Sequence, residues 1–435
     1  MHIRKSTFII LFFFTPLLLH AETSIRHIYL TWKEEETHHN ITVNIHVEGL
    51  LDRLHIYYDR DSQENIPERY LYHVSAPGTP IMDNTRTLFQ VELTELQDDT
   101  LYYFTTGAPE VGYTDEMKFR TIPYESDQYR FVEGGDFEVT EDAVLIAKKA
   151  AEMGPHAAIL GGDYPREVFS ETDFDKWDAW LDIYTQNMIT PEGCLIPMVL
   201  AIGNHEVVGG LEKNPDDAPF YFQYFPQNYE RKSYFLKRFG PDIILFVLDS
   251  GHTARHQGAQ GRWLRKNMER NQEIPIKLAT YHVPIYPSVR FAKKDRSYRI
   301  MRHLLSLCGK RNDIEKLLSL SSAMGRKHWL PIFDEYELTV AFEHHDQTLK
   351  RTKFLRRGEE DPNGTLFLGD GGWGPRLRFT PIQSCFRSCF SKAIGHLAFF
   401  WLIEINKEKL TYKAITKDGQ IVDECTQKIN LRKSR

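Results

Sequence analysis

The chain has 435 residues, of which 41% are hydrophobic and 26% charged, and its formal net charge is −6 at pH 7. This length exceeds one ordinary small domain and the apolar fraction is typical of globular proteins, so we expect two domains with real cores. The mildly acidic balance implies no domain-wide basic face, which argues against nucleic acid as the main partner.

Residues 1–21 have the pattern of a secretory signal peptide. Basic residues precede a short apolar run from Phe8 to Leu19, and a small-residue cleavage pattern ends at Ala21. A membrane anchor is the alternative, but Pro16 breaks the run, which is shorter than the roughly 20 apolar residues that span a bilayer. We therefore expect a secreted or periplasmic protein whose mature chain has no membrane span.

Residues 22–123 are predicted to form an all-β domain. Short aromatic segments such as ITVNIHVEG and TLYYFTTG alternate apolar and polar residues, and polar turns separate them. Period-two patterns at this short spacing are typical of antiparallel strands packed as a β-sandwich. No cluster of catalytic residue types falls in this region of the sequence.

Residues 124–435 alternate strand and helix patterns, which predicts an α/β domain. A helix is expected in TEDAVLIAKKAAEM with Thr140 as its N-cap, and buried strands are expected in YRFVEGGD, AAILGGD, LIPMVLAIGNHE, DIILFVLDS, IKLATYHVP and LTVAFEHHD. Residues of about 287–327 have charged helical periodicity and no strand pattern, so we interpret them as an insertion. Such insertions often form lids, although a helical hairpin without that role fits equally well.

Five of the predicted strands end on polar side chains, and ligands of α/β sheets gather at the carboxyl ends of strands. One such residue alone is usually a turn or a hydrogen-bonded loop residue, but five together favour a shared site. Carboxylates, an amide and imidazoles are ligands for hard or borderline cations, and a bridging carboxylate lets two ions share them. The residues are Asp136 and Glu138, Asp163, Asn204 and His205, His282, and the run His344, His345, Asp346 and Gln347.

The series GGD, GGD, GNHE, a His after a strand, and FEHHDQTLKRT resembles the five-block signature of calcineurin-like metallophosphoesterases, most closely the purple acid phosphatases. The preceding sandwich is similar to the fibronectin III-like domain of that branch. The resemblance implies a two-domain fold: a fibronectin III-like β-sandwich in residues 22–123, and a metallophosphoesterase domain in residues 124–435, in which a β-sandwich is flanked by helices. It also implies a metal-dependent phosphoric ester hydrolase of the acid phosphatase type, with a phosphate ester as substrate.

The resemblance further implies residue roles. Asp163 would bridge two metal ions, Asp136 would belong to the first site, and Asn204, His282 and His345 would complete the second. Family members hold iron at the first site and zinc, manganese or iron at the second, and they hydrolyse esters with a metal-activated hydroxide.

Substrate contacts are implied as well. His205 matches the family residue that contacts the phosphate or protonates the leaving oxygen, so His205 and Asp163 are the expected catalytic residues. Arg166, Lys350 and Arg351 are candidate anion contacts.

The chain departs from the purple branch at the first metal site. Arg166 stands three residues after Asp163, where the family has a metal-binding Tyr, while Tyr164 follows Asp163 so closely that its ring should point away from the metal. Gln347 replaces the second His of the final motif if His345 is the first.

The register that begins at His344 also keeps only one His. Glu138 is a possible oxygen ligand, and a solvent-facing carboxylate is the alternative for it. We therefore expect an oxygen-rich, weakened first site that favours Mn, Mg or Ca or is poorly occupied.

Two other classes of function compete with hydrolysis. A degenerate relative would bind phosphorylated or anionic ligands without turnover, a hypothesis that Gln347 supports. An adhesion or scaffold protein built on the N-terminal sandwich would leave the five polar strand ends unexplained.

Overall fold

The computed structural model describes residues 23–81, 85–165, 173–289, 314–369, 371–375, 386–395 and 397–429, without the side chains of 314–319. The predicted signal peptide, Arg166 and residues 290–313 of the predicted insertion lie outside the described residues. Among the helices that are described, none has both the length and the apolar character needed to cross a membrane.

Residues 23–123 form two antiparallel sheets. One sheet has the order β1-β2-β6-β5, and the other has the order β4-β3-β7-β8 with β9 also paired to β7. Apolar residues of both sheets meet in one buried cluster, as the period-two pattern requires. That this region is a separate, fibronectin-like domain stays a prediction. Its strands are β1 (Ser24–Thr31), β2 (Ile41–Glu48), β3 (Arg53–Asp59), β4 (Tyr72–Pro77), β5 (Thr79–Pro80), β6 (Arg86–Leu93), β7 (Leu101–Ala108), β8 (Gly112–Tyr113) and β9 (Met117–Arg120).

The rest of the chain contains two large mixed sheets, in which β10 to β12 run parallel and so do β14, β15, β16 and β20. A six-stranded sheet has the order β12 (Met198–Leu200), β11 (Ala157–Leu160), β10 (Gln128–Gly134), β22 (Phe399–Asn406), β23 (Lys409–Thr416) and β24 (Ile421–Lys428). A seven-stranded sheet has the order β13 (Phe235–Phe239), β14 (Ile243–Val247), β15 (Ile276–Thr280), β16 (Val340–Phe342), β20 (Leu366–Gly369), β17 (Thr348–Thr352) and β21 (Phe390–Gly395). A small hairpin pairs β18 (Leu355–Arg356) with β19 (Glu359–Glu360).

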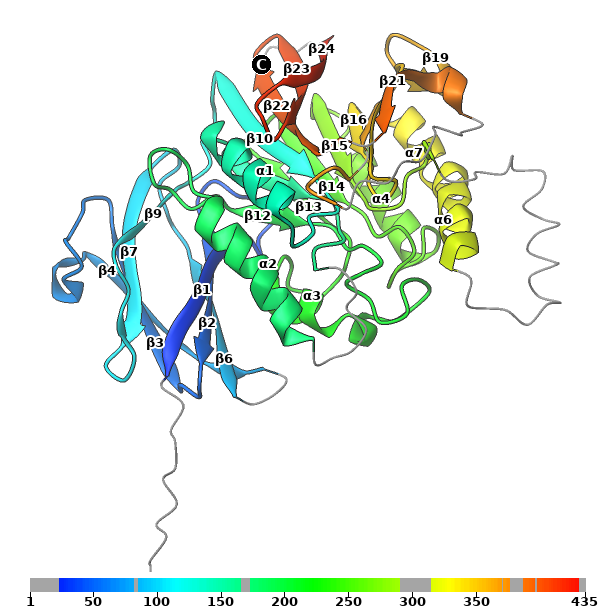
Figure 1. Cartoon of the computed structure of the whole chain (residues 1–435). Coiled ribbons are helices and arrows are strands. Elements are labelled where there is room, and N and C mark those ends of the chain that lie inside the picture. The colour runs from blue at the N-terminus through cyan, green and yellow to red at the C-terminus, as the bar shows by residue number, and fades with distance from the viewer. Residues whose placement is uncertain are drawn as a thin grey trace, which may run out of the picture.

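Helices cover the outer faces of these two sheets. The helices are α1 (Glu141–Glu152), α2 (Phe174–Asn187), α3 (Pro219–Tyr224), α4 (Ala259–Arg270), α6 (Ile314–His328) and α7 (Leu330–Glu335), with 3-10 turns η1 (Pro67–Arg69), η2 (Pro215–Asp217) and η3 (Arg387–Cys389). The predicted N-cap of α1 is present, since the Thr140 side chain accepts a hydrogen bond from the Ala143 N–H. Figure 1 shows α1 and α2 beside the six-stranded sheet and α4, α6 and α7 on the opposite side of the molecule.

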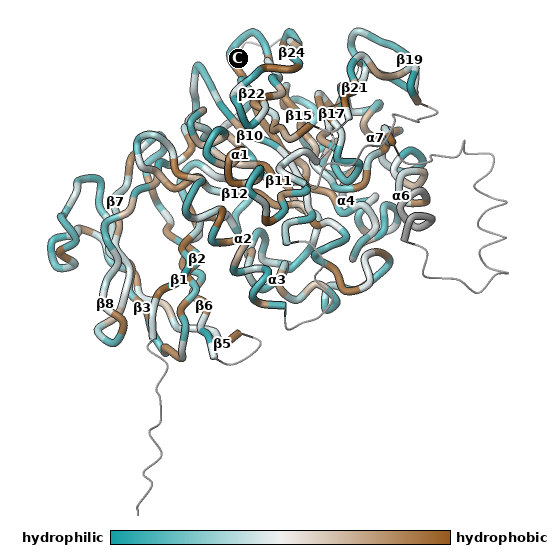
Figure 2. The backbone as a smooth tube through the Cα atoms, viewed as in Figure 1, coloured by the Kyte–Doolittle hydropathy of each residue, from teal (hydrophilic) through white to brown (hydrophobic). Residues whose placement is uncertain are grey.

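Alternation along the strands explains these layers. Phe131 faces a core shared by the two sheets, together with Leu245 of the seven-stranded sheet, whereas the next residue, Val132, packs with α1 and α2. Ile244 packs with α4 and α7 on the other side. Figure 2 shows the apolar segments running through these strands and helices. The strands are therefore buried on both faces, as their continuous apolar runs predict.

The N-terminal sheet that contains β1 is joined to α2 by partly buried polar contacts. Asp178 of α2 lies 2.8 Å from Arg86 and 3.3 Å from Arg26, and Asp182 lies 2.8 Å from His27. These contacts join the N-terminal sheet to α2, the first described helix after β11.

Candidate metal centre

The predicted ligands follow strands of both large sheets. Asp136, Asp163 and Asn204 come after β10, β11 and β12, whereas His282 and His345 come after β15 and β16. The strands within each set run parallel, so their carboxyl ends lie at one edge of each sheet. The candidate centre therefore lies where these two edges meet.

Four side chains supply donor atoms to one small volume. His282 Nε2 lies 3.0 Å from Asp163 Oδ2, 3.1 Å from His345 Nδ1 and 3.2 Å from Asn204 Oδ1. Ligand atoms of Asp163, His282 and His345 all lie within 4.8 Å of one another. Two imidazole nitrogens with a carboxylate and an amide oxygen form a donor set that fits a borderline divalent cation.

The second nitrogen of His282 fixes how its ring faces this group. His282 Nδ1 lies 3.0 Å from the Gly161 carbonyl oxygen, which accepts a hydrogen bond and cannot donate one. Nδ1 therefore carries a proton, and Nε2 is the nitrogen that faces the donor group and would bind a metal once it is deprotonated. This is the usual arrangement of metal-binding histidines.

The backbone is strained at the residues that form the site. Asp136, Asp163, His345 and Gln347 have φ values of 52°, 58°, 74° and 56°. Non-glycine residues rarely occupy this left-handed region, and such strain collects at functional sites. The turns thus aim these side chains at the expense of local stability.

Glu206 is the polar residue of GNHE whose role the sequence does not reveal. Its carboxylate is buried and accepts hydrogen bonds from the backbone N–H groups of Gly203 (2.6 Å), Tyr164 (2.8 Å) and Asp163 (2.9 Å). Burial, followed by the neighbouring charge of Asp163, raises the pKa of Glu206 to about 8, against the opposing effect of these hydrogen bonds. Glu206 ties the loop after β12 to the loop after β11. The sequence signal that could have pointed to a role for Glu206 was its position directly after His205.

Burial and charge act in opposite directions on the carboxylates of the centre. Burial raises the pKa of Asp136 to about 7. Burial also opposes ionisation of Asp163, but His282 and His205 outweigh it and hold the pKa of Asp163 well below its usual range. The pKa of His282 is raised to about 9, because Asp163 outweighs the effect of burial. Two buried carboxylates this close to the donor group, Asp136 and Asp163, favour a bound cation because burying a charge without a counter-charge is costly.

His205 lies at the rim of the group. Its backbone N–H donates to Asp163 Oδ1 at 2.9 Å, and its side-chain Nε2 lies 3.8 Å from Asp163 Oδ2. The side chain is 29% exposed, whereas that of His282 is fully buried. His205 can therefore reach a molecule that approaches from solvent.

The structure brings His345, and not His344, to the donor group. The His344 ring is buried on the other side of its strand, with Nε2 2.9 Å from Glu133 Oε1. A Cβ at Gly161 would overlap this ring, and one at Gly135 would crowd it. The glycines of both GGD segments therefore make room for His344 behind the centre.

Two predicted ligands of the first metal site have other contacts. Gln347 Nε2 donates to Asp136 Oδ1 at 3.0 Å, so an N–H and not an oxygen faces the carboxylate. Glu138 is buried rather than solvent-facing, and it does not join the donor group among the described residues. The Tyr164 ring points away from the centre, as its position in the sequence predicts, and its hydroxyl lies 2.6 Å from the Ala201 carbonyl oxygen.

The predicted anion contacts gain no support from the structure. Arg351 forms a two-bond ion pair with Asp423, at 2.7 and 3.0 Å. Lys350 is buried and donates to Glu343 at 2.6 Å. Both cations are instead engaged in ion pairs within the fold, and Arg166 lies outside the described residues.

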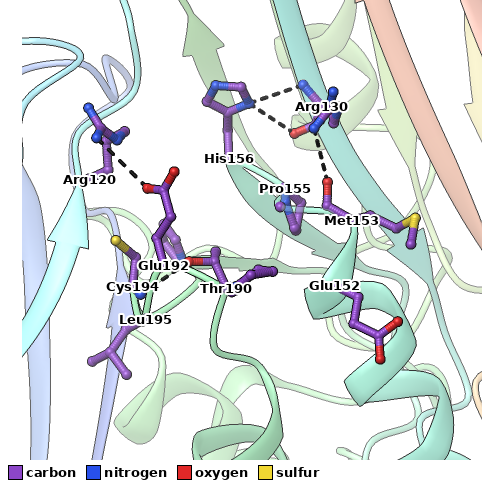
Figure 3. Close-up of a pocket in the computed structure, with 13 residues that line it drawn as sticks. Arg120, Arg130, Glu152, Met153, Pro155, His156, Thr190, Glu192, Cys194 and Leu195 are labelled. Atoms are coloured by element: carbon purple, nitrogen blue, oxygen red, sulfur yellow. Dashed lines mark hydrogen bonds and ion pairs between the residues drawn. The ribbon is translucent and has the colours of Figure 1, made fainter.

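A cavity of about 370 Å³ lies at the opposite end of the same strands (Figure 3). Its lining includes Arg130 in β10 and His156 just before β11. Their polar groups are already engaged, since His156 Nδ1 accepts from the Arg130 backbone N–H at 3.0 Å and Arg130 donates to the Met153 carbonyl oxygen at 3.2 Å. This cavity is therefore no part of the candidate centre.

Comparison with known proteins places the fold. No family profile and no curated protein matches the sequence. Among solved structures, purple acid phosphatase PPD1 from yellow lupin (Lupinus luteus) has 16% identity and a TM-score of 0.69 over 93% of this chain and 74% of that chain. The chain has the same overall fold as this phosphatase.

Two further structures share this fold. PhoD has 10% identity and a TM-score of 0.63, over 92% of this chain and 88% of that chain. GAP50, the anchor in the inner membrane complex of Plasmodium, has 14% identity and a TM-score of 0.50, over 71% of this chain and 91% of that chain. The predicted fold is thus confirmed as one that this chain shares with purple acid phosphatase PPD1 and PhoD.

Proposed function

We propose that this protein is a metal-dependent phosphoesterase that hydrolyses phosphate esters. The observation that carries the proposal is the convergence of Asp163, Asn204, His282 and His345 at hydrogen-bonding distances around one point. A metallophosphoesterase fold with this donor set at its strand ends supports hydrolysis more than binding without turnover.

The residues around the four metal-binding side chains have different roles in the proposed reaction. When bound, a divalent or trivalent ion such as Fe, Mn or Zn supplies positive charge for the phosphoryl oxygens and acidifies water. The partly exposed His205 is placed to donate a proton to the leaving oxygen. The Gly161 carbonyl and the Glu206 carboxylate hold His282 and Asp163 in the required orientation.

We also propose that the protein is exported and that residues 22–123 are a fibronectin III-like domain. The amino-terminal apolar run supports export, and the two antiparallel sheets support the domain assignment. Binding of anionic ligands without turnover is the second candidate, and the N–H of Gln347 next to Asp136 is the observation in its favour.

Two single substitutions test the proposed activity. Asn204→Ala and His282→Ala each remove one donor, so we expect hydrolysis of a chromogenic phosphate ester to fall about a hundredfold or more, since even residues outside the ligand set change activity by 10–100-fold. His39→Ala is the matched control, because His39 is exposed and lies between β1 and β2, outside the two large sheets. This variant should keep wild-type activity. Full activity in either ligand variant would reject a metal mechanism.

A further inference from the structure

We propose that the centre takes one metal ion, held by Asp163, Asn204, His282 and His345, and that Asp136 is a positioning residue and not a ligand of a second ion. This inference rests on the proposed function and deepens it. A two-metal centre is the expectation from the resemblance, and the residues around Asp136 do not fit a second ion.

The first argument is the environment of the Asp136 carboxylate. The side chain is buried, Oδ2 accepts from the His345 backbone N–H at 2.9 Å, and Oδ1 accepts from Gln347 Nε2 at 3.0 Å. A Cβ at Gly371 would overlap Oδ2, so the chain there packs directly against that oxygen. A cation beside Oδ1 would have to displace an N–H donor, whose partial charge has the same sign as the ion.

The amide of Gln347 cannot reverse this arrangement without a cost. A flipped amide would place its carbonyl oxygen against the carboxylate of Asp136, which is unfavourable unless a cation lies between the two oxygens. An ion at this position would therefore have to break the existing hydrogen bond and turn the amide before it could bind. The position that an imidazole ligand occupies in the purple branch carries a hydrogen-bond donor here.

The Tyr164 hydroxyl is not available as a ligand for a second ion either. The Tyr164 hydroxyl lies 2.6 Å from the Ala201 carbonyl and 3.0 Å from the Leu160 carbonyl, and the residue has no exposed surface. It bridges the last residue of β11 and the residue that follows β12. Among the described residues, only carboxylates remain for a first site.

Asp136 instead shapes the remaining site through His345. The His345 backbone has φ of 74° and Gln347 has φ of 56°, a conformation that costs non-glycine residues on the order of 1–3 kcal/mol each. The two hydrogen bonds to Asp136 hold this turn in place across sequence separations of 209 and 211 residues. They thereby keep His345 Nδ1 at 3.1 Å from His282 Nε2.

The test is metal stoichiometry, measured by calorimetric titration with Mn²⁺ or Zn²⁺ and by elemental analysis of protein purified without chelators. We expect one ion per chain. Asp136→Asn should keep one ion with affinity within about tenfold of wild type, because the asparagine oxygen still accepts from His345 and its N–H can meet a flipped Gln347 amide. Asp136→Ala loses both contacts, and its affinity should fall by about 10–100-fold, the range for residues behind the ligands.

Each result decides the matter. Two ions in the wild type, reduced to one by Asp136→Asn, would overturn the inference and leave the proposed function standing. One ion without hydrolysis of any phosphate ester would support the inference and overturn the proposed function. No bound ion would overturn both. Asp136→Asn guards against loss of folding in the alanine variant, and circular dichroism of each variant checks this.

Discussion

Replacing Glu206 by alanine removes a buried carboxylate that accepts three backbone N–H groups, those of Gly203, Tyr164 and Asp163. A buried N–H left without a partner costs about 1–3 kcal/mol. We expect the free energy of unfolding to fall by roughly 3–5 kcal/mol, the lower part of the summed range, since water entering the vacated space replaces some of the lost contacts.

A milder substitution separates lost hydrogen bonds from lost volume. Glu206→Gln keeps one oxygen, which can still accept from Gly203 and Asp163, but its NH₂ group then meets the N–H of Tyr164. We expect it to cost about 1–3 kcal/mol. The affinity for a metal ion should fall at least about tenfold in the alanine variant and less in the glutamine variant. The reason is that Glu206 holds Asp163 in place by accepting a hydrogen bond from the Asp163 backbone N–H.

Urea unfolding followed by tryptophan fluorescence measures the stability, and calorimetric titration measures the metal affinity. Glu212→Gln, at an exposed glutamate of the same loop, is the matched control and should stay within about 0.5 kcal/mol of the wild type. An alanine variant at position 206 with wild-type stability and wild-type metal affinity would refute the role of this carboxylate in holding the two loops together.

Gly161→Ala is expected to destabilise the fold by roughly 1–3 kcal/mol, because its new Cβ would overlap the His344 ring, and an unchanged thermal midpoint would show that the ring moves aside easily. Burial lowers the pKa of His256 to about 3. Between pH 6.5 and 3 the unfolded chain therefore binds more protons at this residue than the folded chain does. The free energy of unfolding should fall by about 1.4 kcal/mol for each unit by which the pH drops through that window. His256→Gln should flatten this part of a urea-midpoint profile, and an unchanged slope would contradict the assignment. Protein loaded with ferric iron should show no visible charge-transfer band, because the Tyr164 hydroxyl is bound to backbone carbonyls; a purple protein would reveal a phenolate ligand.

Local patterns were enough to predict the strands and the residue types that follow them. Each of these two apolar runs that ends in glycine and a polar residue forms a buried strand followed by a turn: VEGGD contains Asp136 and LAIGNHE contains Asn204. The Thr140 cap of α1 was predictable for the same reason, since it depends on residues within one helical turn. The residue types at the strand ends also predicted a metal centre.

Only the tertiary structure decided how those residues face one another. Asp136 and His345 are 209 residues apart, and neither carries a local signal that a carboxylate of one strand end will hold the backbone of another. The choice between His344 and His345 depended on the glycines of two other strands, which leave room for one ring behind the centre. Arg351 pairs with Asp423, which lies on a strand of the other sheet.

The division has a physical cause. Secondary structure depends on periodicity and caps within a few residues, so the sequence by itself determined which segments become strands and which polar groups their ends present. A coordination sphere depends on distances between chain segments that meet only when two sheets pack, and a shift of one residue turns a side chain to the other face. The packed sheets therefore decided that Gln347 presents an N–H to Asp136, and that Glu206 binds three backbone groups instead of a ligand.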